Sequence, residues 1–232
     1  MSETRWFPRR NPVGVVGHRG CLATHRENSI AAFRHAIACG ADAVELDVVL
    51  TTDGELVVSH DPVSCAVEDL PPYIPRLDEV LALGAGSSVV FDIEAKECGA
   101  LTPAPREFAR RIFDCVDGAG LAHRVALRCF QHAVLRAAHE LRPEIPLVAL
   151  TAHHAIDWVG IAERAHARCV SPHFRLVSAR ELERTQKAGI LVMPWTVNKP
   201  RAWGRLIAMG IEWIITDDPA ALIAYVTSGA SA

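Results

Sequence analysis

The sequence predicts an α/β protein built as a TIM-like (β/α)8 barrel. Apolar, β-branched runs alternate with amphipathic helical segments along almost the whole chain, about eight times, which is typical of a closed parallel barrel. The length of 232 residues is close to the roughly 250 residues of such barrels. Polar residues follow the ends of most predicted strands, where barrel enzymes carry their active groups. An open doubly wound sheet is the alternative, but no Gly-x-Gly-x-x-Gly motif follows the first predicted strand.

The composition favours one globular domain over residues 1–232. Hydrophobic residues make up 50% of the chain and charged residues 22%, with no linker or low-complexity segment. A net charge of −3 argues against nucleic acid or an acidic membrane as a partner. The N-terminus lacks an apolar signal segment, no apolar run is long enough to span a bilayer, and the seven cysteines form no Cys-x-x-Cys pair. We therefore expect a cytoplasmic protein with reduced thiols and no stable membrane insertion, whose oligomeric state the sequence does not predict.

The predicted strands are short β-branched and apolar runs bounded by glycine, proline or polar residues. The first ends at Gly17-His18-Arg19-Gly20. The second is followed by an Asp53-Gly54 turn, a returning strand over residues 56–58 and a short insertion over residues 61–75. In order, the eight barrel strands are predicted over residues 13–17, 44–50, 88–93, 124–129, 146–150, 168–171, 190–196 and 212–216.

Helices are predicted between and after these strands from apolar periodicity and from end signals. Ser29 can cap the first helix, and Gly40 ends it. Later helices end at a glycine or before a proline, at Gly84, Pro143, Gly189 and Gly210. In order, the helices are predicted over residues 30–39, 77–83, 106–116, 132–141, 155–165, 179–187, 201–209 and 220–225.

Two carboxylates interrupt the second predicted strand. Glu45 and Asp47 are two residues apart, and side chains alternate along a strand, so both acids point to the same face. Two neighbouring acids in a buried strand repel each other and lose their hydration. A bound hard divalent cation removes this cost, because such ions prefer carboxylate oxygens. Pairing with buried Arg or Lys side chains without a metal is the alternative interpretation.

Other predicted strand ends add complementary chemistry to this rim. The first strand ends at His18 and Arg19, the hairpin returns to His60, and the third strand leads to Glu94 and Lys96. Carboxylates for a cation, basic side chains for an anion and two imidazoles for proton transfer together suit hydrolysis of a phosphate ester. Without such neighbours, each histidine would be read as structural, and Glu94 with Lys96 as a salt bridge.

The sequence resembles the glycerophosphodiester phosphodiesterase family along nearly its whole length. The matching motifs, in chain order, are His18-Arg19-Gly20, Glu27-Asn28-Ser29, Gly40-Ala41-Asp42, Glu-Leu-Asp-Val at residues 45–48, Thr-x-Asp-Gly at residues 51–54, His60-Asp61, Ile74-Pro75-x-Leu77, Glu94-x-Lys96, Trp195-Thr196-Val197-Asn198 and Ile215-Thr216-Asp217. The resemblance implies a TIM-like barrel that hydrolyses glycerophosphodiesters to an alcohol and glycerol 3-phosphate.

The resemblance also implies roles for individual residues. The implied metal ligands are Glu45, Asp47 and Glu94, holding one divalent cation, Mg²⁺ or Ca²⁺. The implied acid and base are His18 and His60. The implied substrate contacts are Arg19 and Lys96 at the phosphate and Asn28 and Trp195 at the substrate end. From the residues alone, we expect Asp92 to be buried and hydrogen-bonded and Asp217 to have a structural role in its loop.

The sequence departs from the family pattern at a few positions. Arg26 stands where proline is frequent, Cys129 stands where serine is common, and the segment over residues 62–73 is shorter and acidic. These changes leave the implied catalytic residues intact and bear on the alcohol part of the substrate. Two other functions fit the same fold: a non-catalytic barrel that binds a phosphorylated ligand, and a lyase related to phospholipase D toxins.

Overall fold

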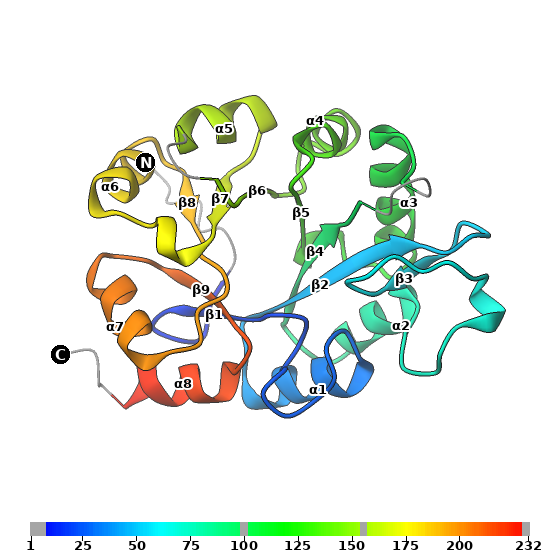
Figure 1. The fold of residues 1–232 in the computed structure, drawn as a ribbon, viewed down its shortest axis with the longest axis horizontal. Coiled ribbons are helices and arrows are strands. Elements are labelled where there is room, and N and C mark those ends of the chain that lie inside the picture. Colours follow the sequence, from blue (N-terminus) through cyan, green and yellow to red (C-terminus); the bar gives the residue numbers. More distant parts are fainter. Residues whose placement is uncertain (1–7, 98–101, 154–156, 229–232) are drawn as a thin grey trace.

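The computed structural model describes residues 8–97, 102–153 and 157–228, which form a parallel β-barrel surrounded by helices (Figure 1). Strands and helices alternate along the chain, and the helices lie outside the strands that they connect. The predicted TIM-like (β/α)8 fold class is therefore confirmed.

The element boundaries agree closely with the sequence-based expectation. The strands are β1 (Gly14–Gly17), β2 (Ala43–Leu50), β3 (Leu56–Val58), β4 (Val90–Ala95), β5 (Val125–Cys129), β6 (Leu147–Thr151), β7 (Cys169–Pro172), β8 (Leu191–Val192) and β9 (Trp213–Thr216). The α-helices are α1 (Ile30–Cys39), α2 (Leu77–Leu81), α3 (Pro105–Gly118), α4 (His132–Leu141), α5 (Trp158–Ala165), α6 (Ala179–Lys187), α7 (Pro200–Ala208) and α8 (Pro219–Thr227). Residues 155 and 156, the first of the helix predicted over 155–165, lie outside the described residues.

The barrel is formed by parallel strands in the order β8-β7-β6-β5-β4-β2-β1-β9, and β3 pairs antiparallel with β2. The segment after β8 continues towards β9. The Val197 N–H donates to the Ile215 carbonyl at 2.9 Å, and the Ile215 N–H donates to the Pro194 carbonyl at 3.1 Å. These bonds bring the two ends of the sheet together and nearly close the barrel.

Alternation along the strands separates two apolar regions. On β4, Phe91, Ile93 and Ala95 belong to the large core between strands and helices. Val90, on the other face, belongs to a smaller cluster with residues of β1, β2, β5, β6, β7 and β9, which fills the barrel interior. Asp92 shares the face of Val90 because side chains alternate. The strand pattern therefore directs the acids of β2 and β4 into the barrel, next to the interior apolar cluster that contains Val90.

Two strands differ from their predicted extent. The strand expected over residues 190–196 is limited to β8, because Pro172 of β7 has no N–H to donate to the Met193 carbonyl, which accepts from the Ser171 hydroxyl at 2.6 Å instead. Trp195 resumes the pairing with a bond from its N–H to the Pro172 carbonyl at 3.1 Å. The strand expected over residues 88–93 begins and ends two residues later, so that Glu94 lies inside β4 rather than after it.

The β2–β3 hairpin and the loop that follows it extend beyond the ring of helices, at the right edge of Figure 1. Val49 and Val57 of the hairpin pack against Val63 of this loop, in a small apolar cluster of their own. The short predicted insertion is thus anchored on the hairpin. None of the helices in the described part of the chain combines the length and the apolar character that crossing a membrane needs.

Candidate active site

Three carboxylates from β2 and β4 converge inside the barrel, as the sequence predicts. Parallel pairing sets Asp47 beside Glu94 and Glu45 beside Asp92. Glu45, Asp47 and Glu94 are buried, and each offers a carboxylate oxygen within 4.8 Å of those of the other two. In the described part of the chain, this is the one group of three acidic, histidine or cysteine side chains with such spacing.

The electrostatics of this cluster favour a bound cation. Burial raises the pKa of Glu45 well above its usual value, and the charge of Asp47 adds to this effect. Burial, followed by the charge of Asp47, likewise raises the pKa of Glu94. Two cations partly compensate: Arg19 Nε lies 3.0 Å and Lys96 Nζ 3.7 Å from Asp47, and Lys96 Nζ lies 3.2 Å from Glu94. Three acids facing two bases leave a negative charge, and an all-oxygen donor set fits Mg²⁺ or Ca²⁺.

The loop between β1 and α1 wraps around the acids. Arg19 and Asn28 both have left-handed backbone conformations, with φ of 50° and 54°, and the Asn28 N–H donates to the Arg19 carbonyl at 3.0 Å. This turn directs the Arg19 N–H to Glu45 Oε2 at 3.0 Å. The Asn28 amide donates to Asp47 Oδ2 at 2.9 Å, and the Arg19 guanidinium donates to Glu27 at 2.7 Å. The loop therefore orients two of the carboxylates, those of Glu45 and Asp47.

A buried ion pair lies on the strands next to the cluster. Arg128 of β5 donates to Asp92 Oδ2 at 3.0 Å and to the Ser171 hydroxyl at 2.6 Å. Burial raises the pKa of Asp92 to about 6, although the charge of Arg128 opposes this effect. Asp92 is thus buried and hydrogen-bonded, as expected from the sequence. Arg128 adds a positive charge that the sequence analysis did not predict.

His18, which follows β1, is held by a carboxylate that follows the neighbouring strand β9. Its Nδ1 lies 2.6 Å from Asp217 Oδ1, and Asp217 Oδ2 accepts a hydrogen bond from the Asn198 amide at 2.5 Å. Burial acts to raise the pKa of Asp217, but the bonds and charge of His18 and the bond from Asn198 outweigh it and lower that pKa. Asp217 is therefore ionised near neutral pH and can only accept, so His18 carries its proton on Nδ1.

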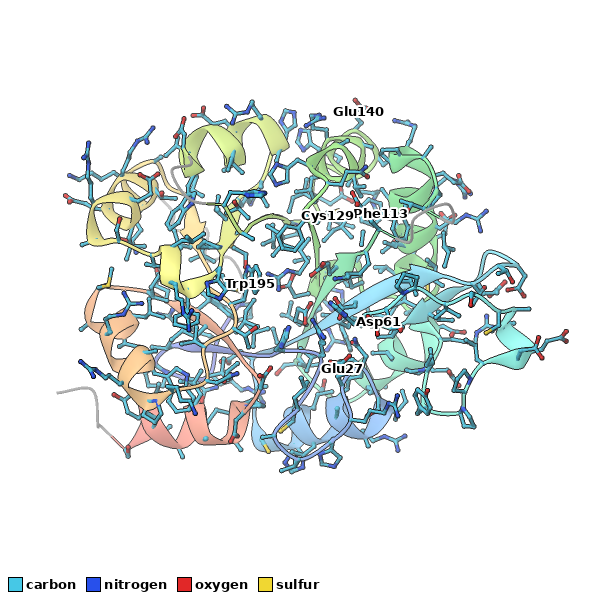
Figure 2. All side chains as sticks on the ribbon, in the orientation of Figure 1. Glu27, Asp61, Phe113, Cys129, Glu140 and Trp195 are labelled. Atoms are coloured by element: carbon cyan, nitrogen blue, oxygen red, sulfur yellow. The ribbon has the colours of Figure 1, made fainter. Side chains whose placement is uncertain are left out.

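His60 lies at the end of β3, where it has an exposed partner. Its Nδ1 is 3.1 Å from Asp61 Oδ1, and the Asp61 side chain is 87% exposed. His60 also lines a pocket of about 300 Å³, together with Glu27 and Asn28 of the β1–α1 loop. Glu27 and Asp61 line this pocket together, and in Figure 2 both lie to the right of Trp195.

Trp195 contributes an aromatic group on the opposite side. Its indole N–H donates to the Ser171 carbonyl at 2.9 Å, which fixes the ring. Phe130 and His173 pack edge-on against it, with ring centres 5.8 and 5.4 Å away. Phe130 remains 45% exposed. An apolar wall therefore borders the site near β7 and β8.

The sequence analysis missed three polar residues of this region. Asp217 was expected to serve its own loop, and no role was predicted for Asn198 or Arg128. The signal available for Asp217 was its place after a predicted barrel strand, which was read as structural. Its partner His18 is 199 positions away in the sequence, so only the closed barrel brings the two together.

Similar solved structures define the class of fold to which this barrel belongs. A phosphodiesterase from Oleispira antarctica, in complex with the product sn-glycerol-3-phosphate, is 20% identical with a TM-score of 0.86, over 98% of this chain and 100% of that one. A glycerophosphodiester phosphodiesterase from Parabacteroides distasonis is 23% identical with a TM-score of 0.82, over 95% and 99% of the two chains. The chain has the barrel fold of these enzymes.

Sequence comparison identifies the family. The model of the glycerophosphoryl diester phosphodiesterase family matches residues 18–78 and 62–221. A glycerophosphodiester phosphodiesterase from Caldanaerobacter subterraneus subsp. tengcongensis is 30% identical over 241 residues, covering 93% of this chain and 98% of that protein. The chain belongs to the glycerophosphoryl diester phosphodiesterase family. The enzyme class predicted from the sequence, a phosphoric diester hydrolase, is confirmed with it.

Proposed function

We propose that the chain hydrolyses glycerophosphodiesters to an alcohol and glycerol 3-phosphate, using a divalent cation, Mg²⁺ or Ca²⁺. The observation that carries the proposal is the convergence of Glu45, Asp47 and Glu94, whose carboxylate oxygens lie within 4.8 Å of one another. The product complex of the Oleispira antarctica relative supports the choice of substrate. When bound to these carboxylates, the cation supplies a Lewis acid for a phosphoryl oxygen.

The basic side chains beside the acids bind the phosphate in this proposal. Arg19 and Lys96 lie beside Asp47, and their positive charges can balance the negative charge of the phosphoryl oxygens. Asn28 holds Asp47 through its amide and is almost fully buried. We therefore assign Asn28 to orienting a metal ligand, while its implied contact with substrate stays a prediction. Trp195, on the apolar side, borders the glycerol end.

The two histidines transfer the protons. One takes a proton from the attacking oxygen, either water or the neighbouring glycerol hydroxyl, as that oxygen bonds to phosphorus. If the glycerol hydroxyl attacks, a cyclic phosphate forms, and water then opens it to glycerol 3-phosphate. The other gives a proton to the alcohol oxygen as its bond to phosphorus breaks. In His18 the Nδ1 proton is held by Asp217, which leaves Nε2 as the nitrogen for this exchange. Such a group contributes about 10²–10⁴ to the rate.

The test is a panel of glycerophosphodiesters with choline, ethanolamine, inositol or glycerol as the alcohol, assayed with Mg²⁺, with Ca²⁺ and with chelator. Glycerol 3-phosphate is measured with a coupled dehydrogenase, and cyclic phosphates are detected by ³¹P NMR. We expect metal-dependent release of glycerol 3-phosphate from at least one substrate. Binding without turnover under all conditions would support the non-catalytic alternative, and a cyclic phosphate as final product would support the lyase.

A further inference from the structure

We propose that the pocket beside His60 receives the alcohol part of the substrate, and that Arg26 makes it select hydroxyl-rich alcohols over quaternary ammonium ones. This inference rests on the proposed function. The pocket has a volume of about 300 Å³, and its walls come from the β1–α1 loop and from the segment after β3. That volume is at the lower end of the range of small-molecule sites, about 300–1,000 Å³, and suits a single ring or a short chain.

The pocket adjoins the reaction centre through shared residues. Glu27 and Asn28 form part of its wall, while Glu27 accepts from Arg19 and Asn28 donates to Asp47. His60, a proposed acid or base, also faces it. A phosphate held at Arg19 therefore has this pocket on one side and the Trp195 wall on the other. The leaving alcohol takes a proton from a histidine, so we place it in this pocket, beside His60.

Arg26 gives the pocket its selectivity. Its guanidinium carbon lies 3.4 Å from the centre of the Tyr73 ring, so the cation contacts the aromatic face. No described carboxylate pairs with Arg26. The stacked guanidinium is held in place, yet its N–H donors are not used by an acid. It can therefore donate to hydroxyl or other oxygen acceptors of a ligand.

The same arrangement disfavours a trimethylammonium group. Recognition of such a cation uses an open aromatic face, and Arg26 already covers one face of Tyr73 with its own positive charge. Of the two carboxylates in the wall, Glu27 is paired with Arg19, and Asp61 is exposed beside His60. No excess of negative charge remains to attract an ammonium. Hydroxyls, in contrast, can donate to Asp61 and accept from Arg26.

The experiment compares kcat/KM for glycerophosphoinositol, glycerophosphoglycerol and glycerophosphocholine. We expect the wild type to prefer the two polyol substrates. Arg26→Gln should lower kcat/KM for glycerophosphoinositol about tenfold, mainly through KM, because a hydrogen bond from a charged group is lost. Glycerophosphocholine turnover should stay within about twofold. Tyr73→Leu removes the ring on which Arg26 rests and should change the preference in the same direction by a smaller factor.

The matched control is Arg136→Gln, which removes the same charge from the exposed face of α4 and should change none of the three values. Thermal unfolding of each variant shows whether the fold is retained. A wild type that prefers glycerophosphocholine, or an Arg26→Gln variant that affects all substrates equally or none, would overturn this inference while the proposed function stands. Absence of turnover on every glycerophosphodiester would instead overturn the proposed function, and this inference with it.

Discussion

Replacing Asp217 by asparagine should trap His18 in an unproductive tautomer. The Asn198 side-chain oxygen accepts from the Asp217 N–H at 2.9 Å and from the Thr216 hydroxyl at 3.2 Å. That oxygen is therefore fixed, and the Asn198 NH₂ group must point at position 217. An asparagine there would turn its own oxygen to Asn198 and its NH₂ group to His18 Nδ1. His18 would then have to accept at Nδ1 and carry its proton on Nε2.

The magnitude follows from two contributions. Loss of a hydrogen bond to a charged group costs about 1.5–3 kcal/mol, which corresponds to a rate factor of about 10–100. Asp217→Ala should show only this loss, because water can accept from Nδ1 and both tautomers remain accessible. Asp217→Asn adds the wrong tautomer, which costs up to about 10⁴ in serine-protease triads. We therefore expect the asparagine variant to be slower than the alanine variant, although it is the more conservative exchange.

The assay is kcat on the best glycerophosphodiester, with ¹⁵N chemical shifts of His18 reporting its tautomer. Asp61→Asn is the matched control, because Asp61 is the corresponding partner of His60 but is 87% exposed. An exposed pair of this kind contributes about 0.2–1 kcal/mol, so kcat should fall by no more than about fivefold. An Asp217→Asn variant that is as active as Asp217→Ala, or within fivefold of wild type, would refute the reasoning.

Other predictions concern the metal, the second histidine and the buried ion pair. Mg²⁺ or Ca²⁺ at 100 times its Kd should stabilise the fold by about 2.7 kcal/mol and therefore raise the melting temperature. Glu45→Gln should abolish this rise in a thermal scan. Because burial and the charge of Asp47 raise the pKa of Glu45, protons compete with the cation, and calorimetric metal affinity should fall from pH 7.5 to 5.5. His60→Ala should lower kcat by about 10²–10⁴ with an unchanged melting temperature, measured in the coupled assay. Arg128→Met should destabilise the fold by about 3–5 kcal/mol in urea unfolding, because it leaves Asp92 without its buried partner.

Local sequence patterns were sufficient to predict the acidic centre. Alternation on β2 placed Glu45 and Asp47 on one face, and the βαβ succession made the next barrel strand its neighbour. Parallel pairing of these adjacent strands then brings Asp47 and Glu94 together. To predict this convergence, the strand ends need to be known only to within about two residues. The predicted end at residue 93 was in fact two residues short, and the convergence of the acids was predicted nonetheless.

The residues that were missed depend on contacts that no local pattern carries. Arg128 lies inside the strand predicted over residues 124–129, and its charge is accommodated because Asp92 and Ser171 reach it inside the barrel. The stacking of Arg26 on Tyr73 joins two loops that the sequence separates by 47 positions, and neither residue belongs to a predicted helix or strand. Such pairs require the tertiary structure, because the local sequence around each residue does not indicate its partner.

The support of His18 shows how closure of the barrel builds the site. β1 has four residues and pairs with β9, so His18 and Asp217, which follow these strands directly, emerge side by side. Asn198 reaches them because the chain after β8 also bonds to β9, through the Val197 N–H and the Ile215 carbonyl. These bonds between the two ends of the sheet bring the Asn198 amide to the Asp217 carboxylate, which holds the His18 imidazole.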